Sequence, residues 1–219
     1  PADAYEKWSG YQPQKISDKD YSKCKTLEFT YKEYPTYSLN IEIDIPTKGK
    51  APYPFFIWVH GGAWAKGSTK AFEDQSKYLA SRGIGGVRLV YSVKKQGGRF
   101  EKGMDELAAA FEFVTKHAEE WQFDMSRYGY AGGSAGTPLS SLAAMKNGAK
   151  GCKLYIGCNG MFNFVMNRQG GFVGGKAPSN NIYLQDVTDF KAISAIHNIP
   201  QKSEDIPAVV LFHGTADIT

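Results

Sequence analysis

The stretch RYGYAGGSAGTPLSSLAAMK, residues 127–146, decides the fold prediction. Its first part, residues 127–133, predicts a short strand. Its last part, residues 137–146, predicts a helix that tolerates Pro138 in its first turn. Between them stands GGSAG (132–136), a G-x-S-x-G. A sharp strand-to-helix turn there projects the serine hydroxyl above the sheet, and the glycines allow a strained backbone and close approach of helix and strand.

Outward from this turn, apolar runs and helical spacings alternate along the chain. Because strand and helix alternate from residue 54 onward, the sequence predicts an α/β fold with a mostly parallel central sheet and helices on both faces. Two earlier stretches, 27–31 and 37–45, alternate as antiparallel strands do. The remaining predicted strands are 54–60, 84–92, 152–158 and 207–214, and the remaining predicted helices are 71–83 and a long one whose buried face runs from Met104 to Ala118.

Length and composition predict one domain, residues 1–219, with a sizeable core. Residues 1–26 form a polar leader, and the Gly- and Asn-rich residues 159–200 are interpreted as an insertion or lid-like segment. The net charge is only +4 with both signs interleaved, which argues against a nucleic-acid partner. No apolar run approaches the roughly 18 residues that a membrane helix needs, so no membrane span is expected. Cysteine spacing predicts no metal site and leaves open whether Cys152 and Cys158 are bonded.

A serine nucleophile needs a base, and the oxyanion formed by its attack on a carbonyl needs hydrogen-bond donors. The stretch VHGGAW, residues 59–64, offers candidate donors because its glycines let backbone N–H groups turn toward a ligand. It follows a strand expected near the middle of the sheet and precedes the serine by two strands, the order that this chemistry uses.

Together these motifs resemble the α/β-hydrolase superfamily, in its esterase/lipase branch with HGG followed by a small residue or Tyr and then Trp. The chain is most similar to bacterial acetyl and feruloyl esterases that act on plant polysaccharides. The resemblance covers about residues 38 to 219. It rests on IDIP (43–46), VHGGAWAKGS (59–68), YLASRG (78–83), VYS (90–92), GYAGGSAG (129–136) and LFHGTAD (211–217).

By this resemblance Ser134 is the nucleophile of an ester hydrolase and Asp217 is the acid of a catalytic triad. The N–H groups of Gly62, Ala63 and Ala135 would form the oxyanion hole, and neither a cofactor nor a metal is implied. The family's base follows the acid by a few tens of residues, so the catalytic histidine is expected after Thr219, in a C-terminal part missing here. The family usually has Gly and then a small residue or His where this chain has Thr137-Pro138.

The four histidines of the chain are weak candidates for the base. His60 is expected to brace the oxyanion turn, and His117 to be solvated beside two glutamates. A structural role is expected for His197, while His213 lies four residues before the proposed acid.

The expected substrates are short-acyl or feruloyl esters of carbohydrates, either small molecules or polysaccharides, and a secreted or periplasmic location is favoured. Two alternatives stay open: a serine peptidase or formamidase on the same scaffold, and a non-catalytic relative that lacks the base. The oligomeric state is open as well.

Overall fold

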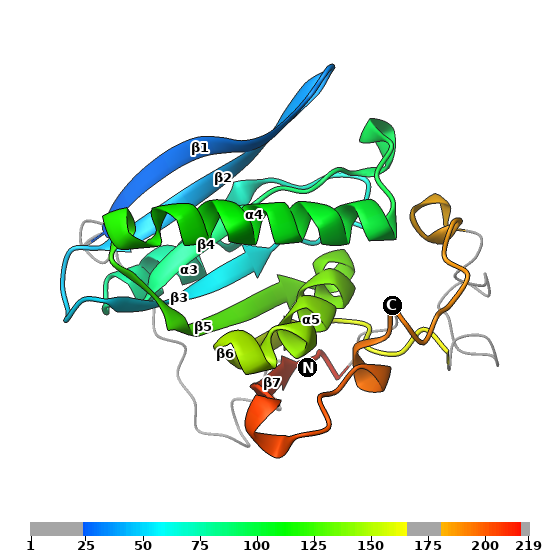
Figure 1. Ribbon diagram of the computed structural model, residues 1–219. Helices are drawn as coiled ribbons and strands as arrows, with labels where there is room; N and C mark the ends of the chain where they lie inside the picture. Colours follow the sequence, from blue (N-terminus) through cyan, green and yellow to red (C-terminus); the bar gives the residue numbers. More distant parts are fainter. Residues whose placement is uncertain (1–23, 166–180, 216–219) are drawn as a thin grey trace.

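A seven-stranded sheet forms the centre of the molecule (Figure 1). The computed structural model describes residues 24–165 and 181–215. The strands lie in the order β1-β2-β4-β3-β5-β6-β7. Their bounds are β1 Cys24–Tyr34, β2 Tyr37–Pro46, β3 Tyr53–Val59, β4 Gly85–Leu89, β5 Phe123–Gly133, β6 Cys152–Cys158 and β7 Ala208–Phe212.

The sheet is mixed at one end and parallel from β4 onward. Strands β1 and β2 pair antiparallel, as do β2 and β4. The pairs β3–β4, β3–β5, β5–β6 and β6–β7 are all parallel. The predicted, mostly parallel sheet is therefore confirmed, together with the antiparallel pair that precedes it.

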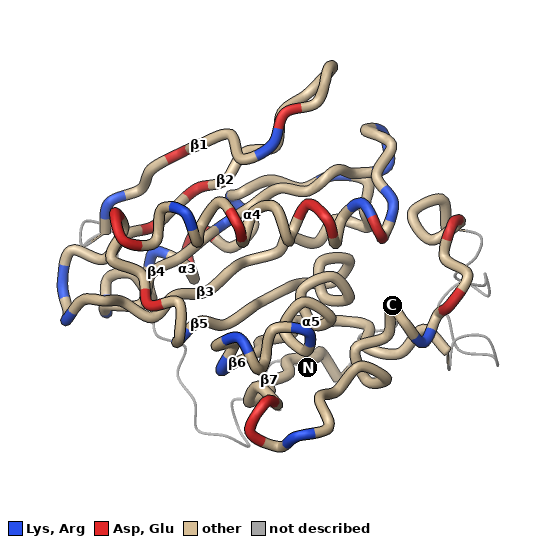
Figure 2. Tube along the Cα trace, viewed as in Figure 1, with Lys and Arg blue, Asp and Glu red and all other residues tan. Residues whose placement is uncertain are grey.

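Helices cover both faces of the sheet, as predicted. The helices are α3 (Glu73–Ala80), α4 (Phe100–Trp121) and α5 (Thr137–Lys146). Helices α4 and α5 lie on one face and α3 on the other (Figure 1). Helix α4 is amphipathic: apolar side chains face the sheet, and acidic and basic positions follow each other along its length (Figure 2). Helix α5 is buried from Thr137 to Met145, because α4 and the sheet enclose it.

Four predicted elements had a boundary wrong by three residues or more. Strand β1 spans Cys24–Tyr34 rather than 27–31. Strand β5 begins at Phe123 rather than at 127. Residues 124–127 are exposed or only partly buried and form no apolar run, so no sequence signal marks this part of the strand. Strand β4 stops at Leu89 instead of continuing to residue 92. The predicted helix 71–83 divides into a 3-10 turn, Thr69–Phe72, and the shorter α3, which ends before the left-handed Gly83.

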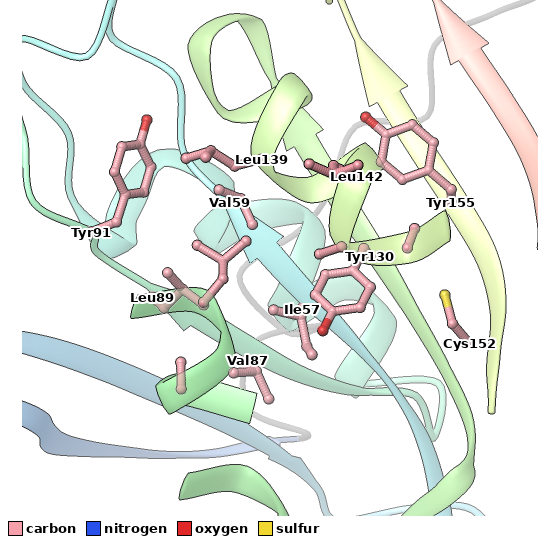
Figure 3. Close-up of a cluster of buried hydrophobic side chains, with 14 of the residues drawn as sticks. Ile57, Val59, Val87, Leu89, Tyr91, Tyr130, Leu139, Leu142, Cys152 and Tyr155 are labelled. Carbon is pink, nitrogen blue, oxygen red and sulfur yellow. The ribbon is translucent and has the colours of Figure 1, made fainter. Parts of the chain in front are cut away.

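The main core lies between the sheet and the α4–α5 layer. Side chains of β3 and β4 alternate: Ile57 and Val59 point to this layer, beside Val87 and Leu89, and meet Leu139 of α5 (Figure 3). A smaller cluster on the α3 face is built on Phe56, Trp58 and Ala131. Both faces of β3 are therefore buried, which explains its continuous apolar sequence.

The edge strand β7 is exposed along its whole length. Its side chains Val209, Val210, Leu211 and Phe212 are 41–58% exposed. Cys152 and Cys158 stand at opposite ends of β6, about 20 Å apart by strand geometry, and both are thiols. Burial raises the pKa of the Cys152 thiol to about 12.

Neither a membrane-spanning helix nor a metal cluster is present among the described residues. No helix within 24–165 or 181–215 combines the length and the apolar character that a membrane crossing demands. The same residues hold no cluster of three or more histidine, cysteine or acidic side chains arranged to bind a metal ion.

Candidate functional site

Ser134 occupies a strained turn between β5 and α5. Its φ is 47°, in the left-handed region that non-glycine residues rarely adopt. The side chain is exposed, whereas the two residues that follow it, Ala135 and Gly136, are buried. Gly133 before it is still extended, so the chain reverses direction at the serine itself. The turn therefore holds the hydroxyl at the C-terminal end of a parallel strand, where the surface is accessible.

The glycines around Ser134 are required by close packing. A β-carbon on Gly136 would lie 2.4 Å from the carbonyl oxygens of both Val59 and His60. A β-carbon on Gly132 would lie 2.1 Å from the hydroxyl of Ser140. Since real β-carbons do not approach so closely, the first turn of α5 can rest on β3 and β5 only with glycine at these positions.

The turn after β3 runs beside Ser134. Gly62, Ala63 and Trp64 have successive φ values of 104°, 54° and 57°. The carbonyl of Gly62 closes the turn by accepting from the N–H groups of Ala65, at 2.9 Å, and Lys66, at 3.2 Å. Its left-handed backbone rotates the peptide groups away from the strand direction. Two of these residues are not glycine, so the surrounding packing must hold them in this conformation.

Three backbone N–H groups of these two turns are candidate donors. Those of Gly62 and Ala63 have no acceptor among residues 24–165 and 181–215. The N–H of Ala135 belongs to the first turn of the helical segment after Ser134, where backbone donors lack intrahelical partners. Such donors can stabilise negative charge that develops on a bound carbonyl oxygen.

The buried side chain of His60 stabilises this turn from the protein interior. Its ring is 2% exposed and stacks on Tyr91 with centroids 4.2 Å apart, and the Tyr91 hydroxyl donates to the His60 carbonyl at 3.0 Å. Nδ1 lies 2.7 Å from the carbonyl oxygen of Gly61; because that oxygen only accepts, Nδ1 carries the proton. Burial lowers the pKa of His60. The imidazole is thus a structural member of the turn.

The other three histidines have different surroundings. His117 contacts Glu120 at 3.1 Å and stacks on Trp121. His197 and His213 are exposed. The hydrogen bonds of His60 and His117 go to Gly61 and Glu120 rather than to Ser134. Asp217, the predicted acid, lies outside the described residues.

A buried ion cluster fixes the segment that follows the turn, and sequence reasoning missed it. Arg88 of β4 donates to both carboxylate oxygens of Asp44, at 2.8 and 3.0 Å, and contacts Glu42 at 2.7 Å. It also donates to the carbonyl of Thr69 at 2.9 Å, and the Thr69 hydroxyl donates to Glu42. Charged residues at buried strand positions were the available signal.

Phe72, three residues after Thr69, lies next to the serine turn. A β-carbon on Gly133 would be 3.0 Å from the tip of the Phe72 ring. The same ring packs on Trp58 with centroids 5.2 Å apart. Sequence reasoning treated Phe72 only as a helix residue, although its place shortly after the Gly-rich turn could have indicated a role at the site.

Thr137 does not distort the helix, despite its departure from the usual pattern. Its φ and ψ are −60° and −47°, and Pro138 stands in the first turn, where its missing N–H costs little. The Thr137 side chain is buried against Gly160. A β-carbon at position 160 would lie 2.0 Å from the threonine methyl, so this packing requires glycine there.

Solved structures define the class of fold. The computed structure matches Thermogutta terrifontis esterase 2 phosphoramylated by tabun with a TM-score of 0.71 and 23% identity, covering 89% of this chain and 73% of the other. The propionate-bound form of this thermophilic esterase from a Planctomycetes species gives 0.70 and 23%, covering 91% and 74%. The fold is the α/β-hydrolase fold, as the sequence predicted.

The family is shown by a match over most of the chain. The BD-FAE family profile matches residues 41–219, and the chain belongs to this family. A curated acetyl esterase of Salmonella schwarzengrund (strain CVM19633) is 26% identical over 107 residues, or 47% of this chain. The match spans only 33% of that relative's length.

Proposed function

We propose that this protein is a serine hydrolase that cleaves carboxylic esters through an acyl-enzyme on Ser134. The observation that carries the proposal is the exposed serine in a left-handed turn at the end of β5, packed against the Gly-rich turn after β3. Membership of the BD-FAE family and the likeness to esterases support the same chemistry.

In the proposed reaction the Ser134 oxygen attacks the ester carbonyl while a base takes its proton. The N–H groups of Gly62, Ala63 and Ala135 stabilise the resulting oxyanion. The alcohol then leaves with a proton returned by the base, and water hydrolyses the acyl-enzyme by the same steps. Asp217 is proposed to orient the base. The base is proposed to be a histidine that this acid orients.

The proposed substrates are esters with a short or aromatic acyl group on a carbohydrate. Support comes from the acetyl esterase among the relatives and from the propionate- and butyrate-bound structures of Thermogutta terrifontis esterase 2. The ring of Phe72 beside Gly133 offers an apolar wall for such an acyl group. We further propose that residues 159–200 cover this region as an insertion.

The test compares p-nitrophenyl acetate with p-nitrophenyl decanoate, and a feruloylated oligosaccharide with its acetylated counterpart, in the full-length protein. The account expects faster hydrolysis of acetate than of decanoate. Ser134→Ala should lose about 10³-fold or more in kcat. Exposed Ser203 provides the matched control, and Ser203→Ala should retain wild-type kinetics. A Ser134→Ala variant with wild-type activity would remove the proposal.

Two other outcomes would redirect the assignment. Hydrolysis of an amide as fast as the matching ester would indicate a peptidase or formamidase. Failure of the full-length protein to form an acyl-enzyme with any ester would indicate a non-catalytic relative.

A further inference from the structure

Four aromatic rings pack on one another in series beside the turn after β3. The turn begins at His60, which stacks on Tyr91 with centroids 4.2 Å apart. It passes through Trp64, which stacks on Tyr183 with centroids 5.1 Å apart and planes only 4° from parallel. Tyr91 and Tyr183 then meet edge to face at 6.4 Å. Tyr91 and Tyr183 contact each other and stack on the residues at the two ends of this turn, His60 and Trp64.

Tyr183 comes from a distant part of the chain. It belongs to a 3-10 turn, Ile182–Leu184, within the segment 159–200, whereas Tyr91 follows β4. Its side chain is fully buried. The segment therefore contributes a core side chain that touches the proposed oxyanion turn from the protein interior.

Trp64 needs such a support. It has a φ of 57° although it is a bulky residue, so the isolated backbone would relax toward an ordinary conformation. Its carbonyl is fixed by the N–H of Lys94 at 2.7 Å, and its side chain is 4% exposed. Conformations of this kind persist only where surrounding contacts over-determine them.

The ring of Tyr183, rather than its hydroxyl, makes the contact. The hydroxyl is buried without a hydrogen-bond partner among the described residues. It lies against Gly103 of α4, where a β-carbon would be only 2.4 Å from the hydroxyl oxygen. Because Gly103 has no side chain, Tyr183 can pack this close to α4.

We propose that Tyr183 is a positioning residue: its ring, seated over Gly103, holds Trp64 and so keeps the N–H groups of Gly62 and Ala63 in the geometry of an oxyanion hole. This inference rests on the proposed function of those two groups. It assigns to the segment 159–200 a role in transition-state stabilisation, in addition to any role in covering the site.

The experiment exploits the contact between residues 103 and 183. In the full-length protein, Gly103→Ala adds a methyl that displaces the Tyr183 ring, while alanine itself favours the helix. The expected result is a kcat lowered by about 10- to 100-fold with KM little changed, since small misplacements of oxyanion donors cost this much. The double variant Gly103→Ala/Tyr183→Phe removes the clashing oxygen and should restore kcat to within about threefold of wild type.

Two further measurements keep the proposal testable. Tyr183→Leu, which loses the planar stack, should also lower kcat, whereas Tyr78→Leu on α3 is the matched control and should not. The tryptophan bands of the near-ultraviolet circular dichroism spectrum, to which Trp64 contributes, can be read without any ester. They should change in Gly103→Ala and return toward wild type in the double variant.

The outcomes separate the two claims. Wild-type kcat in Gly103→Ala, or a double variant no better than the single one, would overturn the positioning role while leaving the proposed function intact. An unchanged circular dichroism spectrum in Gly103→Ala would overturn the proposed contact. Absence of Ser134-dependent ester hydrolysis in the wild-type protein would instead defeat the proposed function.

Discussion

Gly61 lies in direct contact with the turn that carries Ser134. A β-carbon at position 61 would be 3.2 Å from the β-carbon of Ser134 and 2.7 Å from the carbonyl oxygen of Gly133. The turn after β3 and the turn after β5 therefore approach more closely than any side chain at position 61 would allow. This approach brings the proposed oxyanion donors to the serine.

Gly61→Ala should separate the two turns. We expect kcat to fall by at least about tenfold, because a displacement approaching 1 Å at a catalytic centre can cost about 10²-fold. Steady-state kinetics with p-nitrophenyl acetate measures the effect. Gly97 is the control, since no atom lies within 4 Å of its β-carbon position and asparagine tolerates its φ of 70°. If Gly61→Ala were as active as Gly97→Asn, the proposed proximity would be wrong.

Stability should depend on whether the side chain at position 63 is β-branched. At a φ of 54°, glycine relieves strain but adds entropy to the unfolded chain, so Ala63→Gly should change the free energy of unfolding by no more than about 1 kcal/mol. Ala63→Val places a β-branched residue in the same region and should destabilise the protein by about 1–3 kcal/mol while lowering kcat. Urea unfolding, with kinetics on the same samples, decides the point. Equal stability of the two variants would mean that the turn is not held in this conformation.

The predictable part of this molecule is the part that depends on local pattern. The continuous apolar run at β3 and the Gly-rich stretch around Ser134 each indicate one local structure, because burial and turn geometry leave few alternatives. Strand β5 begins earlier than predicted because its first residue, Phe123, pairs with Tyr53 of β3, while the residues up to Tyr128 carry no apolar run.

The missed residues are those whose role comes from tertiary contacts. Nothing near Tyr183 in the sequence indicates that it stacks on Trp64, more than a hundred residues away. Arg88 and Asp44 were taken as ordinary strand residues, although they pair inside the protein. Such pairings depend on which strands become neighbours, and a single sequence carries that information only weakly.

Removing one partner of the buried Arg88–Asp44 pair should lower the free energy of unfolding substantially. Asp44→Ala leaves the buried guanidinium with Glu42 as its remaining carboxylate, and we expect a loss of about 3 kcal/mol in the free energy of unfolding. The control is Glu73→Ala, which removes a partly exposed pair with Lys77 and should cost about 1 kcal/mol or less. Similar costs for both variants in urea unfolding would show that the buried cluster does not hold the segment after the turn.

His60 should make the fold sensitive to mild acid. Its pKa is lowered by burial in the folded state, so the unfolded chain binds more protons below its own pKa of about 6.5. The stability contributed by neutral His60 is therefore present above about pH 6.5 and is lost as the pH falls below that value. Urea unfolding at pH 7.5 and 5.5 measures this loss, which His60→Gln should reduce.

The half-buried His117 provides the comparison for that experiment. His117→Gln should keep the wild-type difference between the two pH values. An undiminished difference in His60→Gln would assign the acid sensitivity to other groups.

The most direct test of the central claim is the covalent reaction of Ser134. A fluorophosphonate, which reacts with activated serine hydroxyls, is a suitable probe. The full-length protein is labelled, assayed for ester hydrolysis, and mapped by peptide mass spectrometry. The account predicts a single adduct on Ser134, formed in proportion to lost activity and absent from Ser134→Ala. Loss of activity with the adduct on another residue, or ester hydrolysis that survives complete modification of Ser134, would contradict it.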